Sequence, residues 1–236
     1  MEEALKIFNN YFKQFDNSLF GVNLKFKHTM RVVDYAEQIA KSIDLSDEDI
    51  DLAKVCALYH DISRFKQWTE YYTFEDSKSF DHGDEGFNIL KELGINDEIV
   101  LNSTKYHNKY KVDDSLDDRT KLFCNITRDA DKIDIVIEQA NECIDDELNI
   151  SDEIMECFRN HRLIENGMNR WDSFLYHMLR CLAFTFDINF KESFKIIKEK
   201  EIVNKKCDNI LSKFNDDRIK EIKDIVNKYI DERISD

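Results

Sequence analysis

The sequence contains no proline and only five glycines among 236 residues. Because these two residue types interrupt helices most strongly, their scarcity favours an almost entirely helical chain with short connections. No apolar run approaches the length that spans a bilayer. The N-terminus opens Met1-Glu2-Glu3 and lacks the apolar stretch of a cleaved signal. We therefore expect an all-α cytoplasmic protein with no membrane partner.

Paired cysteines are also missing. The six cysteines are scattered, with no CxxC pair and no zinc-binding spacing: Cys56, Cys124, Cys143, Cys157, Cys181 and Cys207. Most of them occur within apolar helical patterns, which favours reduced and buried thiols in a cytoplasmic protein.

Basic residues are outnumbered by acidic ones. The chain has 34 lysines and arginines against 49 aspartates and glutamates, which gives a net charge of −15. Nucleic acids and anionic membranes are attracted to basic surfaces, so this charge argues against nucleic acid as a partner. It does not argue against a small anionic substrate, because bound metal ions can reverse the sign of the charge within a pocket.

The sequence does contain a series of histidines and aspartates at intervals of roughly one helix plus one loop. Four of the six histidines belong to this series, which consists of His28, His60, Asp61, His82, His107 and Asp131. Imidazole and carboxylate together are the donors that transition metals bind. Each histidine taken alone is more simply a hydrogen-bonded core residue. Taken with the two aspartates, the set favours a metal site.

The helical patterns place these residues at the inner ends of separate helices. His28 faces inward near the start of a helix from about 25 to 42. A second helix opens at Ser46, which is followed three residues later by an aspartate as in a capping box, and ends at His60. Asp61 lies about 100° further round, so the two side chains can reach one ion.

The other helices of the series have comparable signals. Asp81 can cap a helix that carries His82 at its start and stops at Gly94. Asn96 can cap the next helix, which leads to His107. Together these signals predict two short helices whose ends each present one histidine.

A helix from about residue 117 carries the last aspartate of the series. Asp131 lies on its inward stripe, and Asp129 is the competing ligand. We expect Asp129 and Asp134 to make either surface contacts or contacts around the ligands. The segment 64–78 is rich in aromatic residues, and we expect it to be irregular and to form a wall or lid.

The rest of the chain is also expected to be helical. Helices are predicted at 151–159, 171–186, 190–200 and 215–233, while the pattern over 201–215 is less regular. No low-complexity linker or internal repeat separates this part from the histidine series. We therefore expect one domain over residues 1–236, with a C-terminal helical extension, about 141–236, packed on a metal-binding core, about 20–140.

The ordered motifs resemble a known superfamily. They are His28 in His-Thr-Met-Arg-Val, the pair His60-Asp61 in Leu-Tyr-His-Asp-Ile-Ser-Arg-Phe, and Asp131 in Arg-Asp-Ala-Asp-Lys-Ile-Asp. Over about residues 20–140 the chain resembles the HD-domain superfamily of metal-dependent phosphohydrolases. The resemblance implies an HD-domain helical bundle with an additional C-terminal helical region. The cyclic-dinucleotide branch, with its histidine pair and Gly-Tyr-Pro signature, is not matched.

The resemblance also implies a set of metal ligands. One or two divalent or trivalent transition metal ions are expected, iron or manganese first, with nickel, cobalt and magnesium as alternatives. With two ions, Asp61 would bridge them. The ligands would be His28, His60, Asp61 and Asp131 for the first ion, and Asp61, His82 and His107 for the second.

This ligand set predicts hydrolysis of a small phosphorylated substrate, either a phosphomonoester or a phosphodiester, with nucleotides among the candidates. Metal ions would acidify a water molecule and neutralise phosphate charge. Arg64 and Lys132 could bind phosphate oxygens beside Asp61, or they could be ordinary ion-pair partners. His107, if it is not a ligand, could be the general acid.

Two other functions fit the same residues. A branch of the superfamily with the same order of ligands consists of di-iron oxygenases, and a non-catalytic metal-binding regulatory protein is the third alternative. A homodimer is compatible with the sequence. The pattern of ligands does not distinguish these chemistries by itself.

Overall fold

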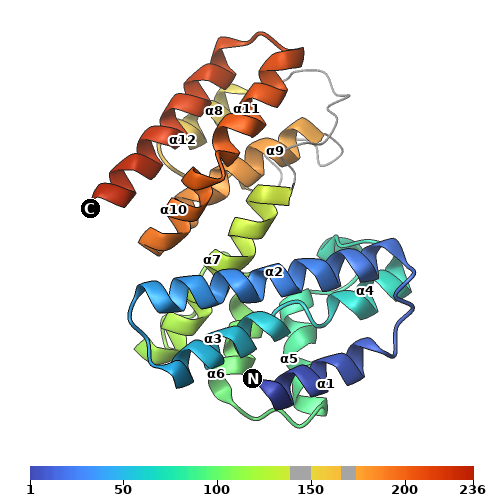
Figure 1. The fold of residues 1–236 in the computed structure, drawn as a ribbon. Helices are drawn as coiled ribbons and strands as arrows, with labels where there is room; N and C mark the ends of the chain where they lie inside the picture. The colour runs from blue at the N-terminus through green and yellow to red at the C-terminus, as the bar shows by residue number, and fades with distance from the viewer. Residues whose placement is uncertain (139–149, 166–173) are drawn as a thin grey trace. The chain divides into compact units, whose positions relative to one another are not determined.

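The computed structural model describes residues 1–138, 150–165 and 174–236, and these residues form helices with no strand among them (Figure 1). The prediction of an all-α protein is confirmed. The chain consists of two compact units, Met1–Asp131 and Lys132–Asp236. Within the described ranges, no helix is both long enough and apolar enough to cross a lipid bilayer. The expectation that the C-terminal helices pack on the metal-binding core as one domain stays a prediction.

The first unit contains six helices and the first part of a seventh. They are α1 (Glu2–Phe12), α2 (Phe20–Ser42), α3 (Asp47–Tyr59), α4 (Arg64–Tyr71), α5 (His82–Glu92), α6 (Glu98–Tyr106) and α7 (Asp118–Glu138). Helix α2 packs against α3 and α4, while α6 packs against both α3 and α5 (Figure 1). Helix α3 therefore lies between the helices that carry or precede the other histidines.

Small side chains allow this close packing around α3. Ala53, Cys56 and Ala57 are fully buried on α3, as are Ala36 and Ala40 on α2. Side chains of this size let neighbouring helix backbones approach one another. The C-terminal end of α3 is thereby placed deep in the unit, beside α2 and α6.

Two of the predicted helix caps are confirmed. The Ser46 hydroxyl accepts a hydrogen bond from the backbone N–H of Asp49 at 3.2 Å. The Asp81 carboxylate accepts hydrogen bonds from two backbone N–H groups at the start of α5. Gly94 follows the end of α5 with a φ of +82°, a left-handed conformation that favours glycine. The Asp81 cap fixes the point at which α5 begins, and so the position of His82.

The predicted cap at Asn96 is wrong. The cap of α6 is Asp97, whose carboxylate accepts hydrogen bonds from the backbone N–H groups of Ile99 at 2.9 Å and Val100 at 3.2 Å. The Asn96 amide instead donates to the carbonyl oxygen of Gly94. An anionic acceptor is favoured at a helix N-terminus, where several N–H groups are unpaired.

The expectation that residues 64–78 are irregular is wrong for the first half of this segment, which forms α4. Phe65 is fully buried, and its ring contacts the rings of Phe8 and Phe12. Trp68, three residues later, covers Gly21 of α2 so closely that a side chain at Gly21 would overlap the indole ring. Two large apolar residues at helical spacing thus hold α4 against α1 and α2.

The second half of the segment leaves the helix. Tyr72 ends α4 in a left-handed conformation, with a φ of 53°, and a short 3-10 helix follows at Asp76–Lys78. This sharp change of direction returns the chain toward α4, so that Phe74 and Asp76 contact Arg64.

The second unit is a separate group of helices. Its elements after α7 are α8 (Asp152–Arg159), α9 (Phe174–Ala183), a 3-10 helix (Phe184–Asp187), α10 (Lys191–Glu199), α11 (Ile202–Lys213) and α12 (Asp217–Ser235). Helix α12 packs against α8, α10 and α11. The less regular stretch 201–215 is largely helical. The first three residues of the predicted helix 171–186 lie outside the described residues.

Candidate metal centre

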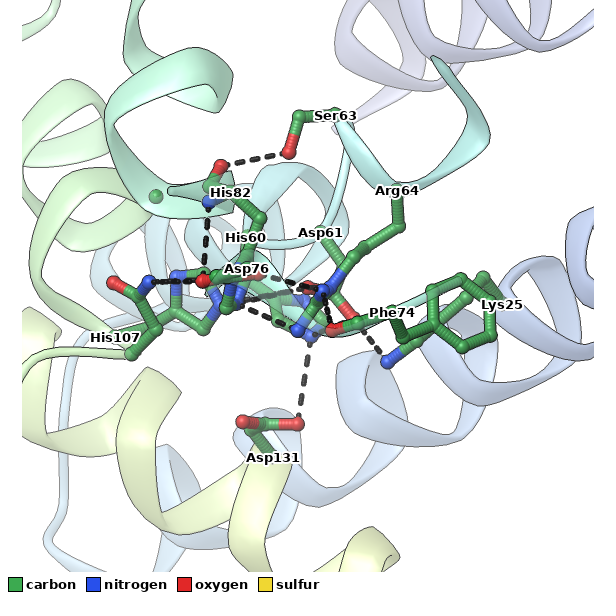
Figure 2. Close-up of polar contacts among 12 residues, drawn as sticks. Lys25, His60, Asp61, Ser63, Arg64, Phe74, Asp76, His82, His107 and Asp131 are labelled. Atoms are coloured by element: carbon green, nitrogen blue, oxygen red, sulfur yellow. Dashed lines mark hydrogen bonds and ion pairs between the residues drawn. The ribbon is translucent and has the colours of Figure 1, made fainter. Parts of the chain in front are cut away.

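The structure brings together all six residues of the predicted series, and all six belong to the first unit. His28 comes from α2, the pair His60-Asp61 directly follows α3, His82 opens α5, His107 directly follows α6, and Asp131 lies on α7. Figure 2 shows five of these side chains labelled, with Asp61 lying among the histidines. The four histidines and Asp61 are buried. Five helices that are distant in sequence therefore converge on one polar cluster.

Asp61 lies between two pairs of histidines and presents a different oxygen to each pair. Its Oδ2 lies 3.5 Å from Nε2 of His28 and 3.4 Å from Nε2 of His60. Its Oδ1 lies 3.7 Å from Nε2 of His82 and 3.4 Å from Nε2 of His107. The Asp61 carboxylate is thus shared by two groups of possible metal ligands, a first donor group with His28 and His60 and a second donor group with His82 and His107.

Asp131 completes the first donor group. Its Oδ1 lies 3.1 Å from Nε2 of His28 and 3.6 Å from Nε2 of His60. Asp129, the competing residue, is fully buried, and so is Asp134. Burial excludes the surface contacts that were one expectation for these two residues. Contacts around the ligands remain the prediction for both.

Hydrogen bonds at Nδ1 fix the orientation of three histidine rings. Nδ1 of His60 lies 2.7 Å from the carbonyl oxygen of Ala57, and Nδ1 of His107 lies 2.7 Å from that of Thr104. Because a carbonyl oxygen only accepts, Nδ1 donates in both cases. A neutral ring then has no proton on Nε2, the atom that faces Asp61. This is how a metal-binding histidine is oriented.

The third ring is held by a carboxylate. Nδ1 of His82 donates to Oδ2 of Asp76 at 2.6 Å. Burial and the neighbouring Arg64 guanidinium lower the pKa of His82 to about 3, so this ring is neutral at physiological pH. Nε2 of His82 therefore also has no proton, and it lies 3.1 Å from Nε2 of His107. Nη2 of Arg64 lies 3.1 Å from the same His82 nitrogen, so positive charge, from this guanidinium or from a metal ion, is favoured at the histidine pair.

The first donor group also favours a positive charge. Burial opposes a charge on His60, but the carboxylates of Asp61 and Asp131 outweigh it and raise the pKa of His60 above its ordinary value. Burial likewise opposes a charge on Asp61, yet the Lys25 ammonium and His60 hold the pKa of its carboxyl well below the usual range. The cluster thus combines ionised carboxylates with a preference for a nearby cation.

The donor atoms fit transition metal ions in both chemistry and spacing. Two donors that each lie about 2.1 Å from one ion, with their bonds at right angles, are about 3 Å apart. The separations within each group, from 3.1 to 3.7 Å, are of this size. Two sets within the described residues have the spacing of metal ligands: His28, His60 and Asp131, and His60, Asp61 and His107.

Arg64 contacts residues of the centre, and its binding of phosphate stays a prediction. Its Nε lies 3.4 Å from Oδ1 of Asp61, and its Nη2 donates to Nε2 of His82 at 3.1 Å. Lys132 has a different observed contact, because its ammonium donates to the carboxylate of Asp187 at 2.5 Å. Binding of phosphate by Lys132 stays a prediction.

Two residues of the centre were missed by sequence reasoning. Lys25 donates to Oδ2 of Asp61 at 2.7 Å, and it precedes His28 by three residues on α2, a spacing that could have identified it. Asp76 contacts His82 and Arg64. It lies in a stretch without periodicity, where no sequence pattern distinguishes it from a surface aspartate.

Comparison with known proteins agrees with this site. Residues 26–135 match the family model of the HD domain, and this stretch contains all six residues of the series. Residues 26–135 therefore have the sequence of an HD domain, the domain after which a superfamily of metal-dependent phosphohydrolases is named. The resemblance inferred from the motifs is confirmed.

Two curated proteins are also similar to the chain. Both are named ribonuclease Y and come from two strains of Ureaplasma parvum serovar 3, ATCC 27815 and ATCC 700970. Each is 33% identical over 96 residues, a match that covers 41% of this chain and 18% of the relative. The matched region thus spans less than a fifth of either relative. No solved structure matches the chain.

Proposed function

We propose that this protein hydrolyses a phosphate ester of a small molecule at a centre that holds two metal ions. The observation that carries the proposal is the position of Asp61, whose two oxygens face two separate histidine pairs. A carboxylate placed in this way can contribute one oxygen to each of two ions. The Nε2 atoms of His82 and His107, which lie 3.1 Å apart and both face Oδ1 of Asp61, support the second ion.

The residues divide between two ions. His28, His60, Asp131 and Oδ2 of Asp61 would hold one ion, and His82, His107 and Oδ1 of Asp61 would hold the other. Iron and manganese are our first candidates, because imidazole and carboxylate suit both. Bound ions of this kind supply a Lewis acid that acidifies water and neutralises charge on a phosphoryl group.

The protein's own groups orient the centre and place positive charge beside it. The Nδ1 hydrogen bonds of His60, His82 and His107 direct each Nε2 inward, so that the neutral form of each ring presents a lone pair to an ion. Arg64, with its Nη2 at the histidine pair, would favour an anionic group at this edge. We propose a small substrate because a net charge of −15 opposes binding of a long polyanion.

A substrate screen with a set of variants tests the proposal. Protein loaded with manganese and kept under argon should hydrolyse at least one ester in a panel of phosphomonoesters, phosphodiesters and nucleotides. Asp61→Asn should abolish this activity, because it removes the charge shared by both donor groups. His161→Asn is the matched control, since His161 lies in the second unit among aromatic rings.

The outcome distinguishes the alternatives. Turnover under argon with manganese excludes a reaction that requires dioxygen. A short RNA is included as a diester because the matched relatives are named ribonucleases. Absence of turnover on every ester, with manganese bound, would contradict the proposal, as would full activity of Asp61→Asn.

A further inference from the structure

Lys25 is a cation at the metal centre that the six-residue series does not include. It lies on α2, and its ammonium donates to Oδ2 of Asp61 at 2.7 Å (Figure 2). The Lys25 side chain is 15% exposed, whereas that of Asp61 is 2% exposed. The Lys25 side chain is therefore partly accessible to solvent, whereas the carboxylate that it contacts is almost fully enclosed.

An aromatic ring holds both cations of the centre. The Lys25 ammonium lies 5.3 Å from the centre of the Phe74 ring, and the Arg64 guanidinium lies 5.6 Å from the same ring. Each cation is attracted to the electron-rich face of the ring. Phe74 thus limits the mobility of the Lys25 side chain and keeps its ammonium beside Asp61.

The two cations differ in the hydrogen bonds that they can still donate. Nη1 of Arg64 donates to Gln67, to the Phe74 carbonyl and to Asp76, at 2.5 to 3.1 Å. Nε and Nη2 of Arg64 are directed at Asp61 and His82. A guanidinium has five N–H groups, so most of those on Arg64 are already used within the protein.

Lys25 retains more donor capacity. Among the described residues its acceptor is Oδ2 of Asp61. An ammonium has three N–H donors, and a carboxylate oxygen has two lone-pair sites. The contact with Asp61 therefore leaves two donors on Lys25, and it leaves Oδ2 with a second lone pair for an ion.

We propose that Lys25 binds an anionic oxygen of the phosphoryl group that is hydrolysed, and is the principal substrate-binding cation of the centre. This inference rests on the proposed function. An ammonium with unused donors beside the shared carboxylate is suited to a charge-assisted hydrogen bond with phosphate. Arg64 then acts mainly as a positioning residue, which connects Phe74 and Asp76 to the histidine pair.

Binding of inorganic phosphate to the manganese-loaded protein tests this role. The Kd is measured by isothermal titration calorimetry, and bound manganese is measured by elemental analysis of the same samples. Lys25→Met should raise the Kd roughly ten- to hundredfold with manganese content unchanged, the size of effect expected for one charged hydrogen bond. Lys25→Arg should restore most of the affinity. Lys27→Met, an exposed lysine on the same helix, is the matched control and should bind phosphate as the wild type does.

The failures of the two proposals can be told apart. If wild-type protein neither binds phosphate nor hydrolyses any ester, the proposed function is wrong. If wild-type protein does both and Lys25→Met binds phosphate equally well, only the role of Lys25 is wrong. Loss of manganese from Lys25→Met would also overturn this role, because it would show that Lys25 supports Asp61 instead of the substrate.

Discussion

At the residue scale, the centre depends on which nitrogen of each histidine carries the proton. The carbonyl oxygens of Ala57 and Thr104 fix this for His60 and His107, because both acceptors come from the helical turn that precedes the histidine. A histidine placed three residues after such a carbonyl at a helix end is therefore oriented by its own backbone. His82 opens its helix and has no preceding turn, so it depends on a side chain from elsewhere.

Asp76 is the residue that orients the His82 ring. Asp76→Ala should weaken manganese binding at the group that contains His82 and His107 by roughly ten- to hundredfold, because His82 loses the acceptor that orients it. The measurement is a manganese titration followed by elemental analysis. When manganese is supplied at a limiting concentration, Asp76→Ala should retain about one of the two ions that the wild type binds.

The control for Asp76 comes from the same segment. Glu75 is exposed and contacts Lys78, so Glu75→Ala should leave manganese binding unchanged. Equal metal affinity in Asp76→Ala and the wild type would show that the contact with Asp76 does not orient His82.

Sequence reasoning identified the six central residues because each type has a chemical preference and each interval has the length of a helix and a loop. It missed Lys25, whose role is visible only when α2 and the end of α3 are placed side by side. It missed Asp76 because the partners of Asp76 are 6 and 12 residues away along a non-repeating path. Contacts of this kind depend on tertiary structure, which no local pattern encodes.

At the scale of elements, α5 and α6 must approach closely for His82 and His107 to meet. Gly83 makes this approach possible. A Cβ at Gly83 would lie 2.6 Å from the carbonyl oxygen of Lys105, and it would also overlap the side chain of Asn108. Because the first of these atoms belongs to the backbone of α6, it cannot move without moving the helix.

Gly83→Ala should therefore separate the start of α5 from the end of α6. We expect loss of manganese from the His82–His107 group, together with a lower Tm. Gly94→Ala is the control, because a Cβ there meets open space and is opposed only by the φ of +82°. It should reduce stability by about 1 to 2 kcal/mol and leave manganese content unchanged. Normal metal content in Gly83→Ala would contradict this account.

Helix ends that carry a capping residue were more predictable from the sequence than the short aromatic helix α4. Ser46, Asp81 and Gly94 each marked a helix end correctly, because each supplies a hydrogen bond or a backbone conformation that the helix end requires. Helix α4 was missed, since its aromatic residues suggested a lid although Phe65 and Trp68 have helical spacing. These aromatic side chains, which suggested a lid, in fact pack α4 against α1 and α2.

At the scale of the whole molecule, each compact unit contains a buried thiol that can report on its unfolding. Burial raises the pKa of Cys56, in the first unit, to about 12, and it raises the pKa of Cys207, in the second unit, to about 12. Both pKa values lie above the ordinary thiol value, so folded protein at pH 8 has almost no thiolate at either site. Alkylation of these cysteines therefore requires local or global unfolding.

Removal of metal should destabilise the first unit. All six donors lie in that unit, and an ion that binds only the folded state stabilises it by about 3 kcal/mol at a hundredfold excess over its Kd. We expect chelation to lower the urea concentration at which Cys56 becomes reactive to iodoacetamide, as followed by mass spectrometry of the labelled peptides. An unchanged midpoint for Cys56 would contradict a metal centre in this unit.

Cys207 tests the domain organisation in the same experiment. If the C-terminal helices pack on the metal-binding core as one domain, as the sequence predicts, the Cys207 midpoint should fall together with that of Cys56. A midpoint for Cys207 that does not move would show that the two units unfold separately.

The sharing of Asp61 between two donor groups has a thermodynamic consequence. An ion bound at Oδ2 would restrict rotation of the carboxylate and alter its charge distribution, and both changes would be felt at Oδ1. The two groups therefore cannot titrate as independent sites. Whatever factor the first ion applies to the affinity for the second, the second applies to the first. If both groups hold ions as proposed, Asp61 would make metal loading a coupled process, in which the occupancy of each group affects the affinity of the other.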